Sequence, residues 1–252
     1  MEATPNLNAH AALVRFQAFA QLSQAELSAM MPMVRNLLHL RKGAFLQEEG
    51  RPSSSVYLLL EGWTASSVMM ADGKRHLLKV HMPGDLIGLP GLSVTKAPDS
   101  VVALTDVSYG QIDLNAFGSI FRDYPRVAAL LFLISQEERL MLMDRLAIVG
   151  QRETPGRVAG MILQLHARLV RQDPTIGDTF HVPLTQADLG DMVGATSVHV
   201  SRTLTDLRKR GIMDWSRQQV VIYDEPALRA ISGLPKRLAA RDWAWLPKAR
   251  SD

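Results

Sequence analysis

The sequence contains no cysteine among its 252 residues. This absence excludes disulfides, thiolate zinc sites, cysteine-ligated iron–sulfur clusters and cysteine nucleophiles. The sequence also lacks an uninterrupted apolar run of roughly 18 residues or more, so no segment predicts a membrane-spanning helix. The N-terminus, Met1-Glu2-Ala3-Thr4-Pro5, lacks the basic and then apolar layout of a secretory signal. We therefore expect a cytoplasmic protein.

Aromatic residues are scarce at 6%, but hydrophobic residues make up 47% and charged residues 21% of the chain. This composition is typical of globular proteins and excludes wholesale disorder, and the length favours two domains. Residues 1–150 contain 13 basic and 14 acidic residues, a net charge of −1. Residues 151–252 contain 15 and 11, a net charge of +4, and the two halves add to the total of +3. The C-terminal excess is compatible with phosphate binding but is too modest to decide it.

Short strands separated by glycine turns are predicted from Leu38 to about Asp113. The turns recur about every ten residues, which favours a compact antiparallel barrel or sandwich. The clearest hairpin signal is Asp72-Gly73, which lies between the apolar segments 66–68 and 76–80. The turns are Lys42-Gly43, Glu49-Gly50, Glu61-Gly62, Asp72-Gly73, Pro83-Gly84-Asp85, Gly88 and Gly91.

Helices are predicted on both sides of this block. Ser23 precedes Glu26 at the spacing of a capping box. A long helix without internal glycine or proline is predicted from about Tyr124 to Gly150. It carries a seven-residue repeat that predicts a dimerisation seam, although packing on its own domain stays an alternative. The seam comprises Val127, Ile134, Met141 and Ile148, with Leu133, Leu140 and Ala147 alongside.

The remaining C-terminal part reads as helices followed by a small hairpin, which is the pattern of a winged helix-turn-helix. Thr154-Pro155 predicts a new helix with Thr154 as its cap, and residues 150–154 are read as a hinge. Strand-like runs occur at 179–182 and 220–223. The tail from Gly233 onward contains Lys236, Arg237, Arg241, Trp243 and Trp245, and its sequence fits either a packed extension or a loose end.

Residues 184–210 predict two helices joined by a tight turn. Thr185 is placed to cap the first helix and Thr196 to cap the second. Gly190 is small where two helices must approach closely, and Gly194 supplies the positive φ that ends the first helix. An ordinary two-helix corner in a packed domain is the alternative to a DNA-reading motif.

The second helix separates into an apolar stripe and an opposite, polar side. Val200, Leu204 and Leu207 form the stripe. On the other side Arg202 is predicted to bind guanine O6 and N7, with Ser201 and Val198 nearby. The remaining members are expected to contact phosphates. The predicted DNA-binding set is Thr185, Gln186, Thr196, Ser197, Val198, His199, Ser201, Arg202 and Thr205.

Over about residues 20–225 the sequence resembles the Crp/Fnr family of bacterial transcription factors. The resemblance rests on the glycine turns listed above, on 57–62 (Tyr-Leu-Leu-Leu-Glu-Gly), on 83–88 (Pro-Gly-Asp-Leu-Ile-Gly), and on 184–190, Gly194 and 198–202. It implies an α+β fold with a cyclic-nucleotide-binding-like β-roll (jelly roll), a long dimerisation helix and a winged helix-turn-helix. The corresponding domains are 1–123, 124–150 and 151–232, with 233–252 as a tail. It also implies a homodimer on palindromic double-stranded DNA.

The effector pocket that the resemblance implies comprises Gly84, Leu86, Gly88, Leu89, Asp99 and Ser100. The family's glutamate for the ribose aligns with Leu89, and its Arg-Ser or Arg-Thr pair for the cyclic phosphate aligns with Asp99-Ser100. Because an aspartate repels a phosphate, we expect no tight binding of cyclic AMP. Haem could use His39, His76 or His81, but His76 and His81 would face opposite sides of a continuous strand. No cofactor or metal is expected, and another effector or none both stay open.

These observations predict a sequence-specific, homodimeric transcription regulator. A ligand-sensing module that acts through protein contacts rather than DNA is the alternative. Activation would require a surface that contacts RNA polymerase, and periodicity reveals none. An enzyme is not expected, because the seven histidines show neither catalytic-triad nor metal-binding spacing and no glycine loop cradles phosphate.

Overall fold

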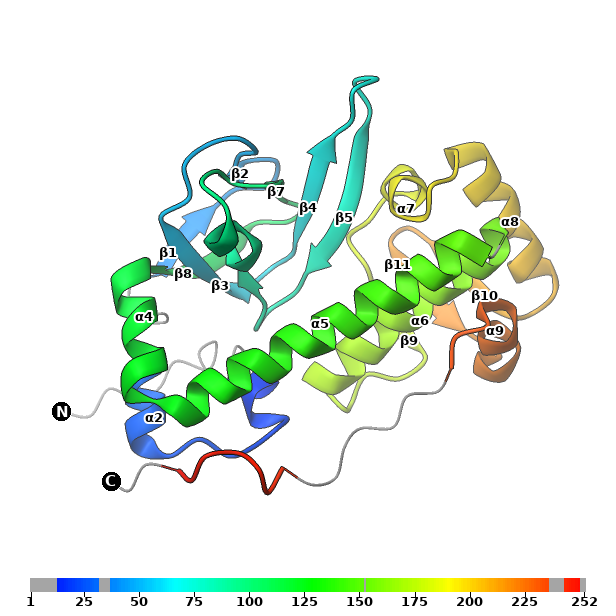
Figure 1. Ribbon diagram of the computed structural model, residues 1–252. Helices are drawn as coiled ribbons and strands as arrows, with labels where there is room; N and C mark the ends of the chain where they lie inside the picture. The colour runs from blue at the N-terminus through cyan, green and yellow to red at the C-terminus, as the bar shows by residue number, and fades with distance from the viewer. Residues whose placement is uncertain (1–12, 32–36, 152, 236–242, 250–252) are drawn as a thin grey trace. The chain divides into compact units, whose positions relative to one another are not determined.

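The computed structural model describes residues 13–31, 37–151, 153–235 and 243–249 (Figure 1). The chain forms two compact units, one within residues 1–135 and 240–252 and the other within 136–239. The helix α5 (Pro125–Gln151) contributes residues to both units. The predicted domain boundaries at 123, 150 and 232 stay predictions.

Two four-stranded antiparallel sheets form the centre of the first unit, as the glycine turns predict. One sheet has the order β1-β8-β3-β6 and the other β2-β7-β4-β5. The hairpin at Gly73, whose φ is 77°, joins β4 to β5 as predicted. The strands are β1 Leu37–Leu40, β2 Phe45–Gln47, β3 Ser55–Glu61, β4 Thr64–Met69, β5 Arg75–His81, β6 Leu86–Ile87, β7 Ser100–Ala103 and β8 Val107–Asp113.

Strand β5 contains a bulge that corrects one expectation. Its pairing with β4 shifts register between Ser66, which pairs with Lys79, and Ser67, which pairs with Leu77. The extra residue reverses the alternation of side chains beyond it. His76 and His81 therefore lie on the same face of the sheet rather than on opposite faces.

Helices cover one side of these sheets in the first unit. Residues 13–17 are helical, and α2 (Gln24–Met30), the 3₁₀ helix η1 (Leu89–Ser93) and α4 (Leu114–Asp123) follow. Ser23 and Glu26 form the predicted capping box. Helix α4 is not predicted by the sequence pattern. The apolar cluster beneath these helices, here called the helical core, contains Phe16, Val56, Leu58, Leu60, Phe117, Ile120, Val127, Leu130 and Ile134.

The predicted dimerisation seam on α5 faces the protomer's own interior, so that part of the prediction is wrong. Val127 and Ile134 are buried in the helical core. Ile148 is buried in the second unit, where a Cβ on Gly160 would lie 2.5 Å from it. A different set of apolar residues on α5 is exposed: Phe132, Leu142, Met143, Leu146 and Val149.

The second unit is the predicted combination of helices and a small sheet, whose order is β10-β11-β9. Its first helix corrects the predicted cap, because Glu153 is the N-cap and Thr154 is the first helical residue. Strand β10 and helix α9 are not predicted. The elements are α6 Thr154–Gln172, β9 Thr179–His181, α7 Gln186–Val193, α8 Ser197–Lys209, β10 Met213–Ser216, β11 Gln219–Ile222 and α9 Glu225–Ser232.

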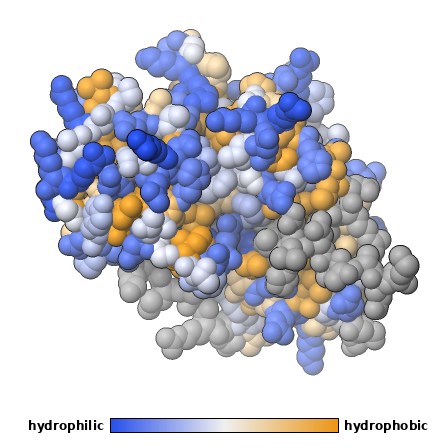
Figure 2. All heavy atoms as spheres, turned by 180° about the vertical axis from the view of Figure 1, so that it is seen from behind, coloured by the Kyte–Doolittle hydropathy of each residue, from blue (hydrophilic) through white to orange (hydrophobic). Residues whose placement is uncertain are grey.

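Apolar residues reach the surface as separate patches between polar ones on the face that Figure 2 presents. None of the described helices combines the length and the apolar character that crossing a bilayer requires.

Candidate nucleic-acid interface

Helices α7 and α8 form the predicted two-helix motif, and their ends are held by local hydrogen bonds. The Thr185 hydroxyl accepts from the Asp188 N–H at 3.1 Å, and the Asp188 carboxylate accepts from the Thr185 N–H at 2.9 Å. This reciprocal capping box begins α7 at the predicted residue. Gly194 ends α7 with φ at 64°, and the Thr196 hydroxyl caps α8 by accepting from the His199 N–H at 3.3 Å. These predictions are confirmed.

The close approach at Gly190 is also confirmed. A Cβ at this position would lie 2.6 Å from the carbonyl oxygen of Ala195, in the turn between the helices. Only a residue without a side chain lets α7 run this close to the turn. Gly190 therefore sets the geometry with which α7 presents α8.

Helix α8 buries the predicted apolar stripe and exposes the predicted reading side. Val200, Leu204 and Leu207 are buried, and Thr203 is buried with them. All nine residues of the predicted DNA-binding set are exposed. Their contacts with DNA stay predictions, but the structure places the members of α8 on one polar side of a capped helix.

Arg202 differs from the arginines near the end of α8. Arg208 is paired with Asp214, and Arg210 is paired with Asp206 at 3.2 Å. In the part of the chain that the structure describes, no side chain or carbonyl makes an ion pair or hydrogen bond with the guanidinium of Arg202. Its planar fork of N–H groups is available for a bidentate acceptor.

The threonines of the predicted set are less available. The hydroxyl of Thr185 donates to Asp188 at 2.7 Å, and that of Thr205 donates to the Ser201 carbonyl at 2.9 Å. A hydrogen bond from either hydroxyl to a phosphate would require it to turn away from its present acceptor. The exposed side chain of Gln186 has no such internal use among the described residues.

The hairpin of β10 and β11 adds residues that the sequence pattern does not predict. Its turn is formed by Arg217 and Gln218, with φ values of 49° and 65°. The turn lacks the Asn-Gly or Asp-Gly signature of such hairpins, so only the alternation of the flanking strands could have revealed it. A cavity of about 320 Å³ joins this turn to the start of α7, and it is lined by Leu184, Thr185, Gln186, Arg208, Trp215, Ser216, Arg217 and Gln218.

The positions predicted to form the effector pocket do not fit a cyclic phosphate. Leu89 packs against the helical core. The Asp99 carboxylate accepts a hydrogen bond from the Gln47 amide at 3.0 Å, and the Ser100 hydroxyl accepts from the Glu49 N–H at 3.0 Å. A carboxylate thus stands where a phosphate would need a cation, and it adds repulsion rather than binding.

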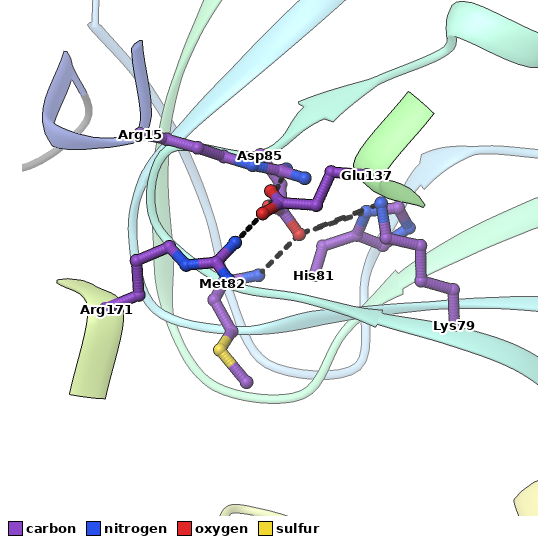
Figure 3. A network of polar contacts seen from close by, with 7 residues as sticks. All are labelled: Arg15, Lys79, His81, Met82, Asp85, Glu137 and Arg171. Atoms are coloured by element: carbon purple, nitrogen blue, oxygen red, sulfur yellow. Dashed lines mark hydrogen bonds and ion pairs between the residues drawn. The ribbon is translucent and has the colours of Figure 1, made fainter. Parts of the chain in front are cut away.

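A buried network around Asp85 anchors the loop before this pocket (Figure 3). Asp85 is 1% exposed and forms an ion pair with Arg15 from the helical residues 13–17. Its other oxygen accepts from the Met82 N–H at 3.2 Å and lies 3.8 Å from both Lys79 Nζ and His81 Nδ1. The figure also draws the ion pair of Glu137 with Arg171, which belongs to the second unit.

Comparison with known proteins decides the family. Residues 37–124 match the model of the cyclic nucleotide-binding domain, and residues 156–231 match that of the Crp-like helix-turn-helix domain. The chain belongs to the Crp/Fnr family of transcription regulators. It is therefore a transcription regulator with a helix-turn-helix DNA-binding domain, as predicted.

Individual relatives of this Crp/Fnr regulator are distant in sequence. It is 23% identical over 212 residues to the transcriptional activator protein anr of Pseudomonas aeruginosa, covering 84% of this chain and 86% of that one. It is 27% identical over 188 residues to the CRP-like cAMP-activated global transcriptional regulator of Mycobacterium tuberculosis, covering 74% and 84%. The structure of FixK2 from Bradyrhizobium japonicum shares the fold, with a TM-score of 0.71 at 24% identity, covering 80% and 98%.

In this Crp/Fnr regulator the β-roll also contains a cavity apart from the predicted pocket residues. It measures about 280 Å³ and is lined by Phe45, Leu46, Gln47, Glu48, Arg51, Pro52, Ser53 and Tyr57. The rings of Tyr57 and Tyr109 meet edge to face at 5.8 Å, and burial raises the pKa of both phenols above the usual value. None of Gly84, Leu86, Gly88, Leu89, Asp99 and Ser100 is part of this lining.

The fold also brings together His39, Ser108 and Glu61, which no sequence spacing reveals. The Ser108 hydroxyl donates to Glu61 at 2.8 Å and lies 3.0 Å from His39 Nδ1. Its proton is therefore directed to the carboxylate and not to the histidine, which is the reverse of an activated nucleophile. Among the described residues, no group of three or more histidines and carboxylates is placed to hold a metal ion.

Proposed function

We propose that this Crp/Fnr regulator binds a palindromic operator as a homodimer and reads one guanine in each half-site with Arg202. The observation that carries the proposal is the unpartnered, exposed guanidinium of Arg202 on the polar side of α8. In a helix-turn-helix the second helix enters the major groove with its N-terminal half against the bases. A bidentate arginine on guanine O6 and N7 discriminates against other bases by about 1–3 kcal/mol.

The exposed residues of α5 support a homodimer. They recur in alternating steps of four and three residues, which is the spacing of a coiled-coil seam. Leu146 is 74% exposed, Phe132 57% and Leu142 52%, and no described part of the chain covers them. The seam comprises Ala128, Phe132, Ser135, Arg139, Leu142, Leu146 and Val149. We place a second copy of the chain on it, because a two-fold palindrome requires two identical readers.

The charges beside this seam favour two parallel copies of α5. In a parallel pair, a core residue lies beside the residue that precedes its counterpart on the other helix. Arg139 is exposed within the seam and Glu138 precedes it. Arg139 of one copy then lies beside Glu138 of the second copy, and the two-fold axis repeats the attraction. A shifted register would bring unlike neighbours together and lose both pairs.

Control by cyclic AMP is not part of the proposal. One relative is named as cAMP-activated, but here Asp99 and Leu89 stand at the positions that would bind the phosphate and the ribose. Regulation therefore depends on another small molecule or on the amount of protein. We place the protein in the cytoplasm with its DNA, and activation of a promoter would add a contact with RNA polymerase.

The test is selection of bound duplexes from a random pool by the full-length protein without added ligand. The wild type is expected to enrich a palindrome with half-sites about one helical turn apart. Arg202→Ala should lose the preference for one guanine per half-site while still binding. Arg210→Ala, at the far end of the same helix, is the matched control and should keep the preference.

Two results would contradict the proposal. Selection of the same guanine by Arg202→Ala would remove its assigned role. The absence of any enriched sequence, with and without cell extract as a source of effector, would favour a module that acts through protein contacts.

A further inference from the structure

The end of the chain packs on the first unit, although the DNA-binding unit precedes it in sequence. Residues 243–249 belong to the first unit, whereas α9 belongs to the second. Trp243 meets Phe19 edge to face at 5.3 Å and Trp245 at 6.5 Å. Leu246 packs against the helical core. Of the two readings of the tail, the packed extension is correct for these residues, while Lys236, Arg237 and Arg241 lie outside the described residues.

The surface under this segment is shared with two elements of functional interest. The helical core also receives Leu89 from η1, in the predicted effector loop, and Leu130 and Ile134 from α5. Helix α5 is the element that leads into the DNA-binding unit. The docked segment thus contacts the same apolar cluster as the loop and the helix through which an effector signal would have to pass.

The docking also gives the second unit two covalent connections to the first. One is α5 and the other is the chain between Ser232, the last residue of α9, and Trp243. These residues are 243 − 232 = 11 steps apart, so even a fully extended chain keeps them within about 40 Å. The match to the helix-turn-helix family model ends at residue 231, so this connection is an addition to the family's domain.

We propose that residues 243–249 act as an intramolecular clasp that limits the movement of the DNA-binding unit and so favours binding to a palindrome. This inference rests on the proposed function. A palindrome requires two reading helices to engage at a fixed spacing at the same time. Movement that is already restricted before binding does not have to be lost on binding, which strengthens the complex. A single half-site makes no such demand.

The first test compares Trp243→Ala with Trp245→Ala, whose exposed ring makes it the matched control. We expect Trp243→Ala to weaken binding to the selected palindrome about five-fold or more, a typical size for coupling between two parts of a protein. Binding to a duplex with one intact and one scrambled half-site should stay unchanged. Trp245→Ala should bind both duplexes as the wild type does. Loss of folded protein would instead weaken both duplexes equally.

The second test separates tethering from simple support of the fold. A chain that ends at Leu234 is measured with and without a synthetic peptide of residues 236–252. The peptide should restore thermal stability, because it can occupy the same surface, but it should not restore affinity for the palindrome, because it no longer links the units. Restored affinity would overturn the clasp.

The two proposals can fail separately. If the wild type binds the palindrome and Trp243→Ala binds equally well, the clasp is wrong and the proposed function stands. If the wild type binds no duplex under any condition, the proposed function fails and the clasp fails with it.

Discussion

Gly190 and Gly118 both lie inside helices, but their surroundings are opposite. A Cβ at Gly190 would lie 2.6 Å from a backbone oxygen, whereas a Cβ at Gly118 of α4 would meet nothing within 4 Å. We expect Gly190→Ala to lower the free energy of unfolding by about 1–3 kcal/mol, because the turn of the motif has to move. Gly118→Ala should raise it by roughly 0.5–1 kcal/mol, because alanine favours a helix. Urea denaturation of both variants measures these changes.

The Gly118 variant is the control for the general effect of replacing a helical glycine. If Gly190→Ala were as stable as the wild type, the close approach of α7 to the turn would not constrain the motif. A destabilised but folded Gly190→Ala should also bind DNA less tightly, because α8 is presented from that turn.

At the residue scale, the sequence predicts contacts that are local in the chain. The caps at Ser23, Thr185 and Thr196 follow from the residue type and its place before a helix. Thr154 shows the limit, because a cap also needs an extended backbone and that conformation lies at Glu153. The ion pair of Arg15 with Asp85 joins residues 70 positions apart, and no local pattern predicts such a contact.

At the scale of elements, α5 shows why a repeat alone does not identify an interface. The residues 127, 134, 141 and 148 repeat every seven, and so do 128, 135, 142 and 149, one residue along. The two sets lie about 100° apart around the helix. Only the packing of the protomer reveals which set is already covered. The apolar residues of the covered set are also the stronger hydrophobic signal, so the sequence favours the wrong face.

Leu146→Glu tests the exposed seam of α5. Two buried glutamates would face each other across the two-fold axis, so we expect the dimer to separate into monomers at micromolar concentration. Ala147 is exposed on the same helix but lies off the seam, and Ala147→Glu should stay dimeric. Sedimentation analysis of the two variants gives the comparison. Two dimers, or two monomers, would show that this stripe is not the interface.

The elements that the sequence misses are those without a distinctive pattern. Strand β10 is only four residues long and its turn lacks the usual glycine. Helix α4 directly follows β8 and is separated from α5 only by Tyr124, so its pattern merges with that of its neighbours. In contrast, the glycine turns of the β-roll and the capped helices of the DNA-binding motif each carry residues with a single conformational use. These parts of the fold and of the candidate site are therefore predictable.

At the scale of the whole molecule, charge and symmetry combine in the binding of DNA. The net charge of +4 lies in residues 151–252, and each phosphate that a protein neutralises releases counterions. The logarithm of affinity consequently falls with the logarithm of salt concentration, by about 0.9 for each phosphate contact. A dimer on a palindrome makes every such contact twice, whereas a monomer makes it once.

Arg217 in the turn of β10 and β11 is the side chain with which this doubling can be counted. It lines the same cavity as Gln186 at the start of α7, where a phosphate would also meet the positive end of a helix. Arg217→Ala should reduce the salt slope by about 1.8 in the dimer and by about 0.9 in the Leu146→Glu background. The preferred base sequence should not change, because a phosphate contact carries no base information. Measurement of affinity across a salt series gives both slopes. Equal reductions in the two backgrounds would contradict a two-fold complex, and an altered base preference would place Arg217 in a groove instead of on the backbone.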